Sequence, residues 1–230
     1  GVLAGQKDGG KFIEAQIARE IELAQLYPGF DAAGQNVEVV FAFGNGHNAR
    51  QVADVTVAQG APQELAWLVP GDNAAPAFVE VRAVDGDALS DLPSTIGVTL
   101  IAPDGSAVSA AGTSRRGAIE AEPPVTATGG TVPARLYVVP PRDFAAPPCR
   151  PRPSQPGYVL AAIAPTRARG RALPVALPGD WILKLENGGD RPVRVILQVQ
   201  RGDTAPGVRG ARRQSRFDGA LVPQFVDGIA

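Results

Sequence analysis

Residues 181–200 read WILKLENGGDRPVRVILQVQ, and this stretch decides the fold class. Hydrophobic residues recur at every second position over 181–186 and again over 193–200, which is the period of half-buried β-strands. Between the two runs, residues 187–190 read Asn-Gly-Gly-Asp, a composition typical of tight turns. The stretch therefore predicts two strands joined by a hairpin connection.

The same two-residue period continues through most of the chain after residue 50. Further strands are predicted at residues 52–59, 64–69, 77–82, 96–101, 134–139 and 158–164. Pro, Gly and Asp cluster as turn signals at residues 70–72, 103–105 and 178–180. About eight strands without intervening helices predict a mainly β fold, an antiparallel jelly-roll-like β-sandwich. We expect this sandwich to span residues 51–201.

The first 50 residues have a different pattern. Isoleucines four positions apart predict an amphipathic helix over residues 11–26, which a Tyr-Pro-Gly sequence then ends. The apolar run at residues 37–43 predicts a buried parallel strand. Helix followed by buried strand is the start of an α/β layer, so residues 1–50 are expected to be an incomplete α/β domain. Residues 202–230 are expected to form an extended tail or return segment.

Composition argues against several classes of partner. The chain of 230 residues has 22 Lys and Arg against 23 Asp and Glu, so its near-zero net charge favours neither nucleic acid nor anionic lipid. No apolar run approaches the roughly 18–20 residues that a membrane helix needs. We therefore predict no nucleic-acid partner and no membrane partner.

Cysteine and histidine each occur once, which limits the chemistry available to the chain. One Cys excludes an intrachain disulfide, and together with one His it argues against a Cys-rich or His-rich metal site. We predict no metal and no other cofactor, and we interpret Cys149 as an incidental thiol in a proline-rich loop. The chain also lacks methionine and a signal-peptide pattern, so we expect it to be a piece of a longer polypeptide.

The predicted buried strand ends in a motif that points to catalysis. Gly-Asn-Gly after a strand is by itself typical of a turn, but Ala42-Phe43-Gly44-Asn45 follows a helix and a buried strand. This unit resembles the Ala-Ala-Gly-Asn segment of subtilisin-like serine proteases, with Phe43 in place of the second Ala. The resemblance implies that Asn45 donates a hydrogen bond to the oxyanion of the tetrahedral intermediate. Gly44 and Gly46 would let substrate and backbone approach closely.

A second resemblance covers the β region. It resembles the β-sandwich inserted into some bacterial subtilisin-like proteases, between the oxyanion Asn and the serine segment. The resemblance spans residues 11–218 and implies a secreted or periplasmic location. The stretches that carry it are Leu65–Trp67, Pro70–Asp72, Pro76–Val81, Gly179–Leu183, Val199–Gly207 and Arg212–Asp218.

The catalytic triad of the family is not complete in this sequence. Its Asp and His segments are missing and are expected upstream. Gly112-Thr113-Ser114 matches the start of the family's serine segment but continues Arg-Arg-Gly-Ala between predicted strands, so we interpret it as a polar turn. His47 lies two residues after Asn45 and is interpreted as a loop imidazole. The expected partners are a polypeptide substrate and the remaining protease polypeptide, which would supply Asp, His and Ser. Alone, the chain is predicted to be inactive.

The two tryptophans have two possible roles, as ligand platforms or as core residues. Trp67 and Trp181 each sit in an alternating strand, which favours the core. We predict that both are buried between the two sheets, with Glu80 and Lys184 on outer faces. The arginines at 212, 213 and 216 are expected to be solvated.

Two further functions remain open. The chain could be a non-catalytic β-sandwich binding module, because such sandwiches often present loops to carbohydrate or protein. It could also be a degenerate protease homologue that acts as a scaffold. The helix and strand predicted over residues 11–43 favour the protease, because an adhesion module would not need them.

Overall fold

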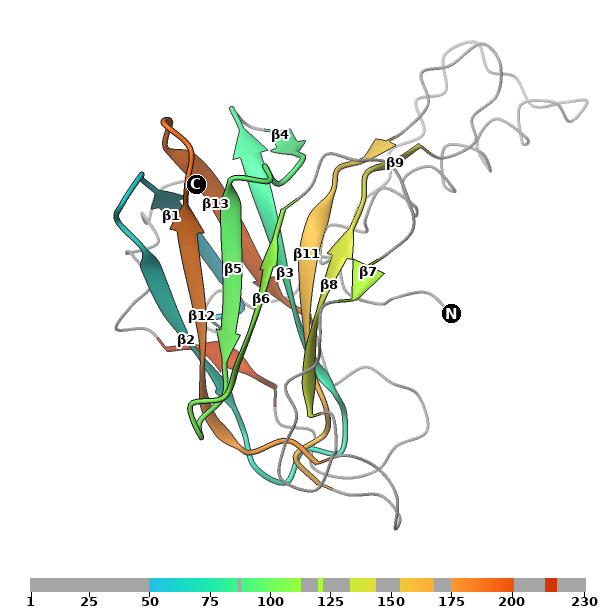
Figure 1. Cartoon of the computed structure of the whole chain (residues 1–230). Coiled ribbons are helices and arrows are strands. Elements are labelled where there is room, and N and C mark those ends of the chain that lie inside the picture. Colours follow the sequence, from blue (N-terminus) through green and yellow to red (C-terminus); the bar gives the residue numbers. More distant parts are fainter. Residues whose placement is uncertain are drawn as a thin grey trace, which may run out of the picture.

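The computed structural model describes residues 50–86, 88–112, 120–121, 133–143, 154–167, 175–200 and 214–218. These residues form two antiparallel sheets that pack face to face (Figure 1), and they contain no helix. The predicted mainly β, antiparallel fold is thus confirmed for this part of the chain. Within it, nothing has the length and apolarity of a membrane-spanning helix. The helix predicted over 11–26 and the strand over 37–43 lie outside the described residues.

The larger sheet contains seven of the described strands. Its order is β1 (Val52–Val57), β13 (Val193–Val199), β3 (Ala77–Asp85), β11 (Tyr158–Ile163), β8 (Ala134–Val139) and β7 (Glu120–Ala121), and β4 (Ala88–Ser90) also pairs with β3. The smaller sheet has the order β14 (Arg216–Phe217), β2 (Gln63–Val69), β12 (Gly179–Asn187), β5 (Ile96–Ile101) and β6 (Ala107–Ala111). A separate two-stranded ribbon joins β9 (Arg142–Asp143) to β10 (Ser154–Gln155).

The strands pair in a nested order along the chain. β1 pairs with β13, β2 with β12, and β3 with β11, while β5 and β6 form a hairpin in the middle of the sequence. Successive nested pairs alternate between the two sheets. Most pairings therefore join segments that are far apart in the sequence.

The hairpin predicted at residues 187–190 is wrong. β12 and β13 belong to different sheets, so this turn carries the chain from one sheet to the other. The side chain of Asn187 stabilises this turn. Its Nδ2 donates to the carbonyl of Val57 at 3.0 Å and to that of Arg191 at 2.7 Å, and its Oδ1 accepts from Gly189 N at 2.8 Å. Residues next to one another in the sequence indicate the turn. The partner of each strand depends instead on which apolar faces are buried together in the folded chain.

The core lies between the sheets and confirms the prediction for both tryptophans. Trp67 and Trp181 face each other in register on β2 and β12, and Phe217 on β14 continues the row beside Trp67. All three are almost completely buried in one cluster with the inward-facing Val, Leu, Ile and Ala side chains of both sheets. The Nε1 of Trp181 donates to the carbonyl of Leu177 at 3.0 Å.

Lys184 and Glu80 both lie on outer faces, as predicted, but Glu80 is buried there. Lys184 is partly exposed on the smaller sheet, where its Nζ lies 2.8 Å from the carboxylate of Glu186. Glu80 is only 4% exposed, although it alternates with the core residues Val79 and Val81 and so faces away from the core. Its carboxylate accepts from Arg82 and Gln200, as described below.

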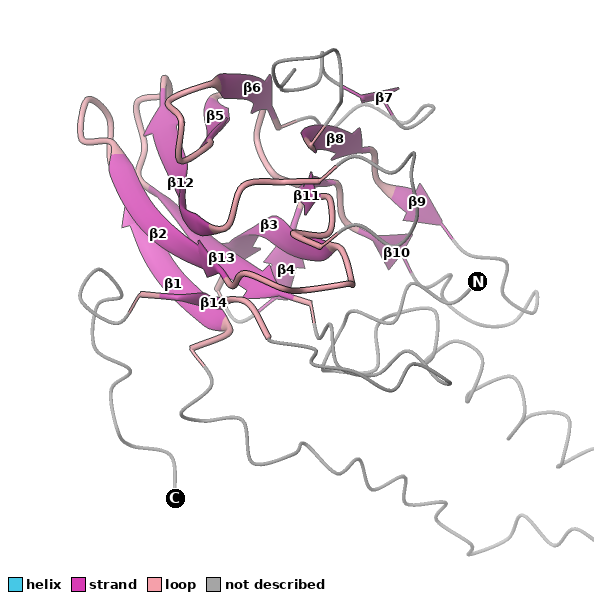
Figure 2. Ribbon diagram, turned by 90° about the horizontal axis from the view of Figure 1, so that it is seen from below, coloured by secondary structure: helices cyan, strands magenta, loops and turns pink. Residues whose placement is uncertain are grey.

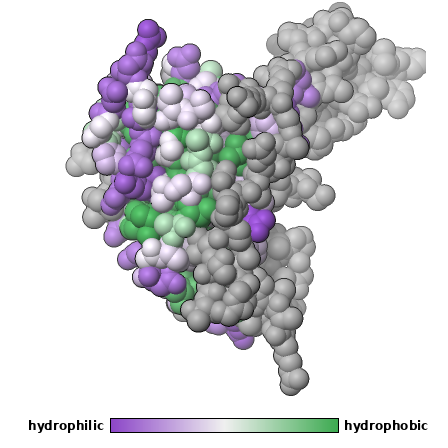
Figure 3. All heavy atoms as spheres, viewed as in Figure 1, coloured by the Kyte–Doolittle hydropathy of each residue, from purple (hydrophilic) through white to green (hydrophobic). Residues whose placement is uncertain are grey.

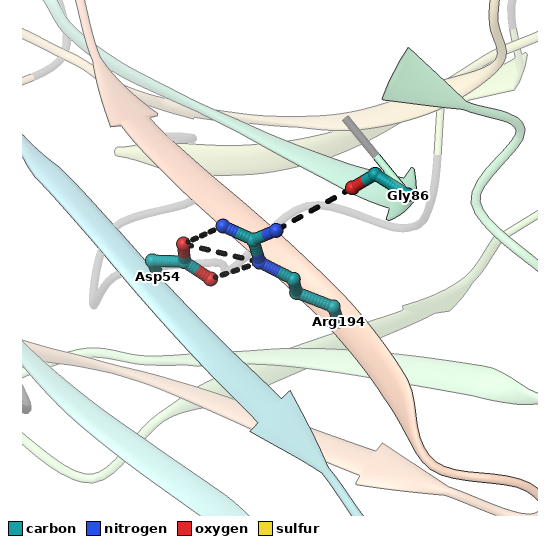
Figure 4. A network of polar contacts seen from close by, with 3 residues as sticks. All are labelled: Asp54, Gly86 and Arg194. Atoms are coloured by element: carbon teal, nitrogen blue, oxygen red, sulfur yellow. Dashed lines mark hydrogen bonds and ion pairs between the residues drawn. The ribbon is translucent and has the colours of Figure 1, made fainter. Parts of the chain in front are cut away.

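The described part of the surface seen in Figure 3 has hydrophilic residues along its outer edge and hydrophobic residues nearer its middle. The exposed large hydrophobic side chains among the described residues are Val175 and Leu177. At the edge of the larger sheet, the guanidinium of Arg194 on β13 pairs with the carboxylate of Asp54 on β1 and reaches the carbonyl of Gly86 at 3.5 Å (Figure 4). Both charged side chains are nearly half exposed, so the pair contributes at most about 1 kcal/mol.

Candidate functional site

The residues predicted to act in catalysis lie outside the described part of the chain. These are Asn45, Gly44 and Gly46, together with His47, Ser114 and Cys149. The structure therefore places none of them. Because His47 and Cys149 are the only His and Cys of the chain, the described residues contain no imidazole and no thiol.

The Gly-Thr-Ser triplet begins at a residue that the structure does describe. Gly112 directly follows β6, and its N–H donates to the carbonyl of Ile96 at 2.9 Å. A Cβ at this position would lie 2.4 Å from the carbonyl oxygen of Pro93 and 2.5 Å from that of Leu92. The glycine is therefore required by close packing at the end of the smaller sheet.

The described residue nearest to Asn45 in the sequence is Arg50, five positions later. Its carbonyl accepts a hydrogen bond from Phe217 N at 2.8 Å, and its Nη1 lies 3.9 Å from Oδ1 of Asp218. On the outgoing side, β14 pairs with β2 (Figure 2). The segment that enters the sandwich and the segment that leaves it thus meet. We call residues 50–51 and 214–218 the junction.

Both segments of the junction are hydrogen-bonded to strands of the sandwich or to residues next to them. On the incoming side, the carbonyl of Gln51 accepts from Val199 N, at the end of β13, at 2.7 Å. On the outgoing side, Asp218 N donates to the carbonyl of Ala66 on β2 at 2.9 Å. Nε2 of Gln214 donates to the carbonyl of Gln200 at 3.0 Å. The end of β13 and the middle of β2 therefore fix the junction.

A buried polar cluster extends from the junction across the outer face of the larger sheet. Gln200 belongs to both, because its carbonyl binds the junction while its Nε2 donates to Oε1 of Glu80 at 2.9 Å. The other oxygen of Glu80 accepts from Nε of Arg82 at 2.7 Å. The guanidinium of Arg82 in turn lies 3.8 Å from the ring centroid of Tyr158. We call Glu80, Arg82, Tyr158 and Gln200 the outer-face cluster.

Burial determines the electrostatics of this cluster. The side chains of Glu80 and Arg82 are 5% and 4% exposed, so each charge depends on the other for compensation. Removing one partner of such a pair typically costs about 3–5 kcal/mol. Burial, and then the negative charge of Glu80, raise the pKa of Tyr158, against the opposing effect of Arg82. Nη2 of Arg82 is buried with no hydrogen-bond partner among the described residues.

The outer-face cluster is suited to holding structure rather than to making or breaking bonds. Among the described residues, no group of three or more Asp, Glu, His or Cys side chains could hold a metal ion. The carboxylate of Glu80 is engaged by two donors on its own sheet. From the sequence, Glu80 and Arg82 could be placed on one face by their spacing of two. Nothing in the sequence indicated that Tyr158 and Gln200 join them.

Comparison with known proteins adds one structural likeness. No protein-family model matches the sequence, and no curated protein matches it significantly. Among solved structures, the chain is similar to the CspB protease of Clostridium perfringens, with a TM-score of 0.41 and 13% sequence identity over 74% of this chain. The matched region is 27% of that protease, so the chain spans about a quarter of its length. A likeness at this level does not assign the chain to a family.

Proposed function

We propose that this chain is part of a subtilisin-like serine endopeptidase, which hydrolyses peptide bonds through an acyl-enzyme. Residues 1–50 would contribute a helix and a buried strand to the protease layer, and residues 51–201 would form an inserted jelly-roll-like β-sandwich. The remaining protease polypeptide would supply the catalytic Asp, His and Ser. The residues that motivate the proposal are Ala42-Phe43-Gly44-Asn45, which resemble the oxyanion segment of this family.

The observation that supports insertion is the meeting of the two segments at the junction. A domain inserted into another must begin and end at nearly the same place, because both of its ends continue into the host. Arg50 and Phe217 are joined by a backbone hydrogen bond of 2.8 Å although 167 positions separate them (217 minus 50). The closure is compatible with insertion but does not by itself separate it from a binding module, because the termini of single domains often lie close together as well.

The nested strand pairing supports the jelly-roll-like assignment. Double-sheet jelly rolls have eight main strands distributed over two sheets. Here the four nested pairs, β1 with β13, β2 with β12, β3 with β11 and β5 with β6, supply eight strands in two sheets. The six-residue strand β8, which pairs with β11, and the short strands β4, β7 and β14 would then be additions to this frame.

Asn45 is the residue to which we assign the catalytic contribution of this chain. Acyl transfer through a serine develops negative charge on the former carbonyl oxygen, and a preorganised neutral donor stabilises that charge. The Asn amide can donate to the oxyanion while its own carbonyl is anchored. Five residues separate Asn45 from Arg50, and five residues of fully extended chain reach at most about 18 Å. The oxyanion donor is therefore tethered closely to the junction.

The test is Asn45→Ala in the complete protein that contains this chain. We expect kcat to fall by about 10²–10³, the magnitude known for losing such a donor in this same family, while KM changes little. His47→Ala is the matched control, and it should retain activity because His47 is not assigned to the site. Unchanged turnover of a folded Asn45→Ala variant would remove Asn45 from catalysis.

A fluorophosphonate probe separates the proposed function from its alternatives. The chain of 230 residues alone should not be labelled, because it lacks the triad, whereas the complete protein should be labelled at a serine outside it. Labelling of Ser114 that His47→Ala abolishes would contradict the proposal and indicate a self-contained hydrolase. No labelling of the complete protein would instead favour a binding module or a degenerate scaffold.

A further inference from the structure

We propose that the outer-face cluster fixes the position of the junction and that it does so through Gln200, the positioning residue. We call this arrangement the clamp. Gln200 is the last link between two sets of contacts. Its side chain donates to the buried carboxylate of Glu80, while its own carbonyl accepts from Gln214 of the outgoing segment. The effect of the clamp on catalysis rests on the proposed function, but the clamp itself does not.

The first step is that the position of Gln200 is determined by buried contacts on β3. Gln200 N donates to the carbonyl of Phe78 at 2.9 Å, and Gln200 is 6% exposed. Its Nε2 meets Oε1 of Glu80, whose other oxygen is engaged by Arg82. Hydrogen bonds to a charged group are stronger than those between neutral groups, so this link resists displacement.

The second step is that both segments of the junction depend on where Gln200 lies. The residue before it, Val199, donates to the carbonyl of Gln51 on the incoming segment. The carbonyl of Gln200 accepts from Gln214 on the outgoing segment, three residues before Phe217 enters the core. A shift of Gln200 would therefore displace both segments together, and with them the tether to residue 45.

The third step is that side chains of this kind suit a positional role better than a purely stabilising one. A buried ion pair contributes little net stability compared with apolar residues of similar volume. Its value lies in geometry, because the carboxylate accepts only from correctly placed donors. The carboxylate of Glu80 thus fixes the direction of the Gln200 amide and not merely its burial.

The experiment removes the donor of the link. Gln200→Leu takes away Nε2, which donates to Glu80 at 2.9 Å, and leaves the pair of Glu80 and Arg82 intact. Gln200→Glu replaces the donor with a second carboxylate beside Glu80, which is unfavourable because like charges then share one site. Gln63→Glu on β2 makes the same chemical change away from the cluster and is the matched control.

Amide hydrogen exchange of the full 230-residue chain is the readout. In Gln200→Glu we expect exchange at Val199, Phe217 and Asp218 to accelerate roughly ten- to a hundredfold, while amides of β5 and β6 keep their protection. Gln200→Leu, which removes the donor without adding charge, should give the same pattern if Gln200→Glu does not fold.

Two outcomes would overturn the clamp. These are unchanged exchange at the junction and equal acceleration of exchange in both sheets. None of these readouts requires peptidase activity. An inactive complete protein would therefore count against the proposed function and leave the clamp to be decided by exchange alone.

Discussion

Gly112 should tolerate no side chain, and the structure allows the cost to be worked out. In Gly112→Ala, the new Cβ would lie 2.4 and 2.5 Å from the carbonyl oxygens of Pro93 and Leu92, and 2.8 Å from Cγ of Leu92. Ordinary contacts begin about 1 Å further out, so both carbonyls must move. They are not free to do so without loss, because Pro93 O accepts from Ile96 N at 3.0 Å and Leu92 is fully buried. Overpacking of this kind, with a distorted hydrogen bond, should cost about 3 kcal/mol.

Urea denaturation measures this cost, with Gly97→Ala as the matched control. Gly97 pairs with Ala111 in the same sheet, next to Gly112, but the nearest atom to its added Cβ is a carbonyl oxygen 3.9 Å away. We expect Gly97→Ala to change the free energy of unfolding by less than about 1 kcal/mol in either direction. If Gly112→Ala unfolds at the same urea concentration as Gly97→Ala, with an unchanged slope, the packing described here is incorrect.

Three further predictions concern polar groups. Asn187→Ala should lower the free energy of unfolding by about 2–4 kcal/mol, because it leaves two backbone carbonyls and one N–H without their partner. A urea titration measures this, and a loss under about 1 kcal/mol would contradict the prediction. Burial, and then the charge of Glu80, raise the pKa of Tyr158, so the stability that its protonated form contributes is complete below the unfolded pKa of about 10 and is lost as pH rises through the higher folded pKa. Tyr158→Phe should therefore lose less stability than the parent as the pH rises above about 10, and parallel curves of stability against pH would refute this. Asp54→Asn should lower the free energy of unfolding by at most about 1 kcal/mol, because the pair of Asp54 with Arg194 is nearly half exposed. The difference in stability from the parent should shrink in about 1 M salt, and a larger loss that salt does not change would contradict this prediction.

Strand positions were largely predictable because alternation is a local property of the sequence. The strands predicted at 96–101 and 134–139 have those bounds in the structure. β6 was missed, since its sequence, Ala-Val-Ser-Ala-Ala, has a single strong β-former among small residues. The turn at 187–190 was recognised, but its classification as a hairpin was wrong because β12 and β13 lie in different sheets.

The candidate site was predictable to a lesser degree. Asn45 was selected by its resemblance to a family segment, and it stays a prediction because it lies outside the described residues. The junction and the outer-face cluster could not be foreseen. Glu80 was expected on an outer face, but nothing near it in the sequence indicates that its carboxylate accepts from Gln200, 120 positions further along the chain, or that Arg82 lies over the ring of Tyr158.

The sequence by itself determined which segments are strands and which of their side chains face the core, because the two-residue period places Trp67, Trp181 and their neighbours on one face. Only the tertiary structure decided which strands pair. Pairing depends on how two apolar faces close over one another and on the register that follows, and neither is written in any local pattern. The packing of the two sheets brings Arg50 to Phe217 at the junction and Gln200 to Glu80 in a buried hydrogen bond. No local pattern in the sequence indicates either contact.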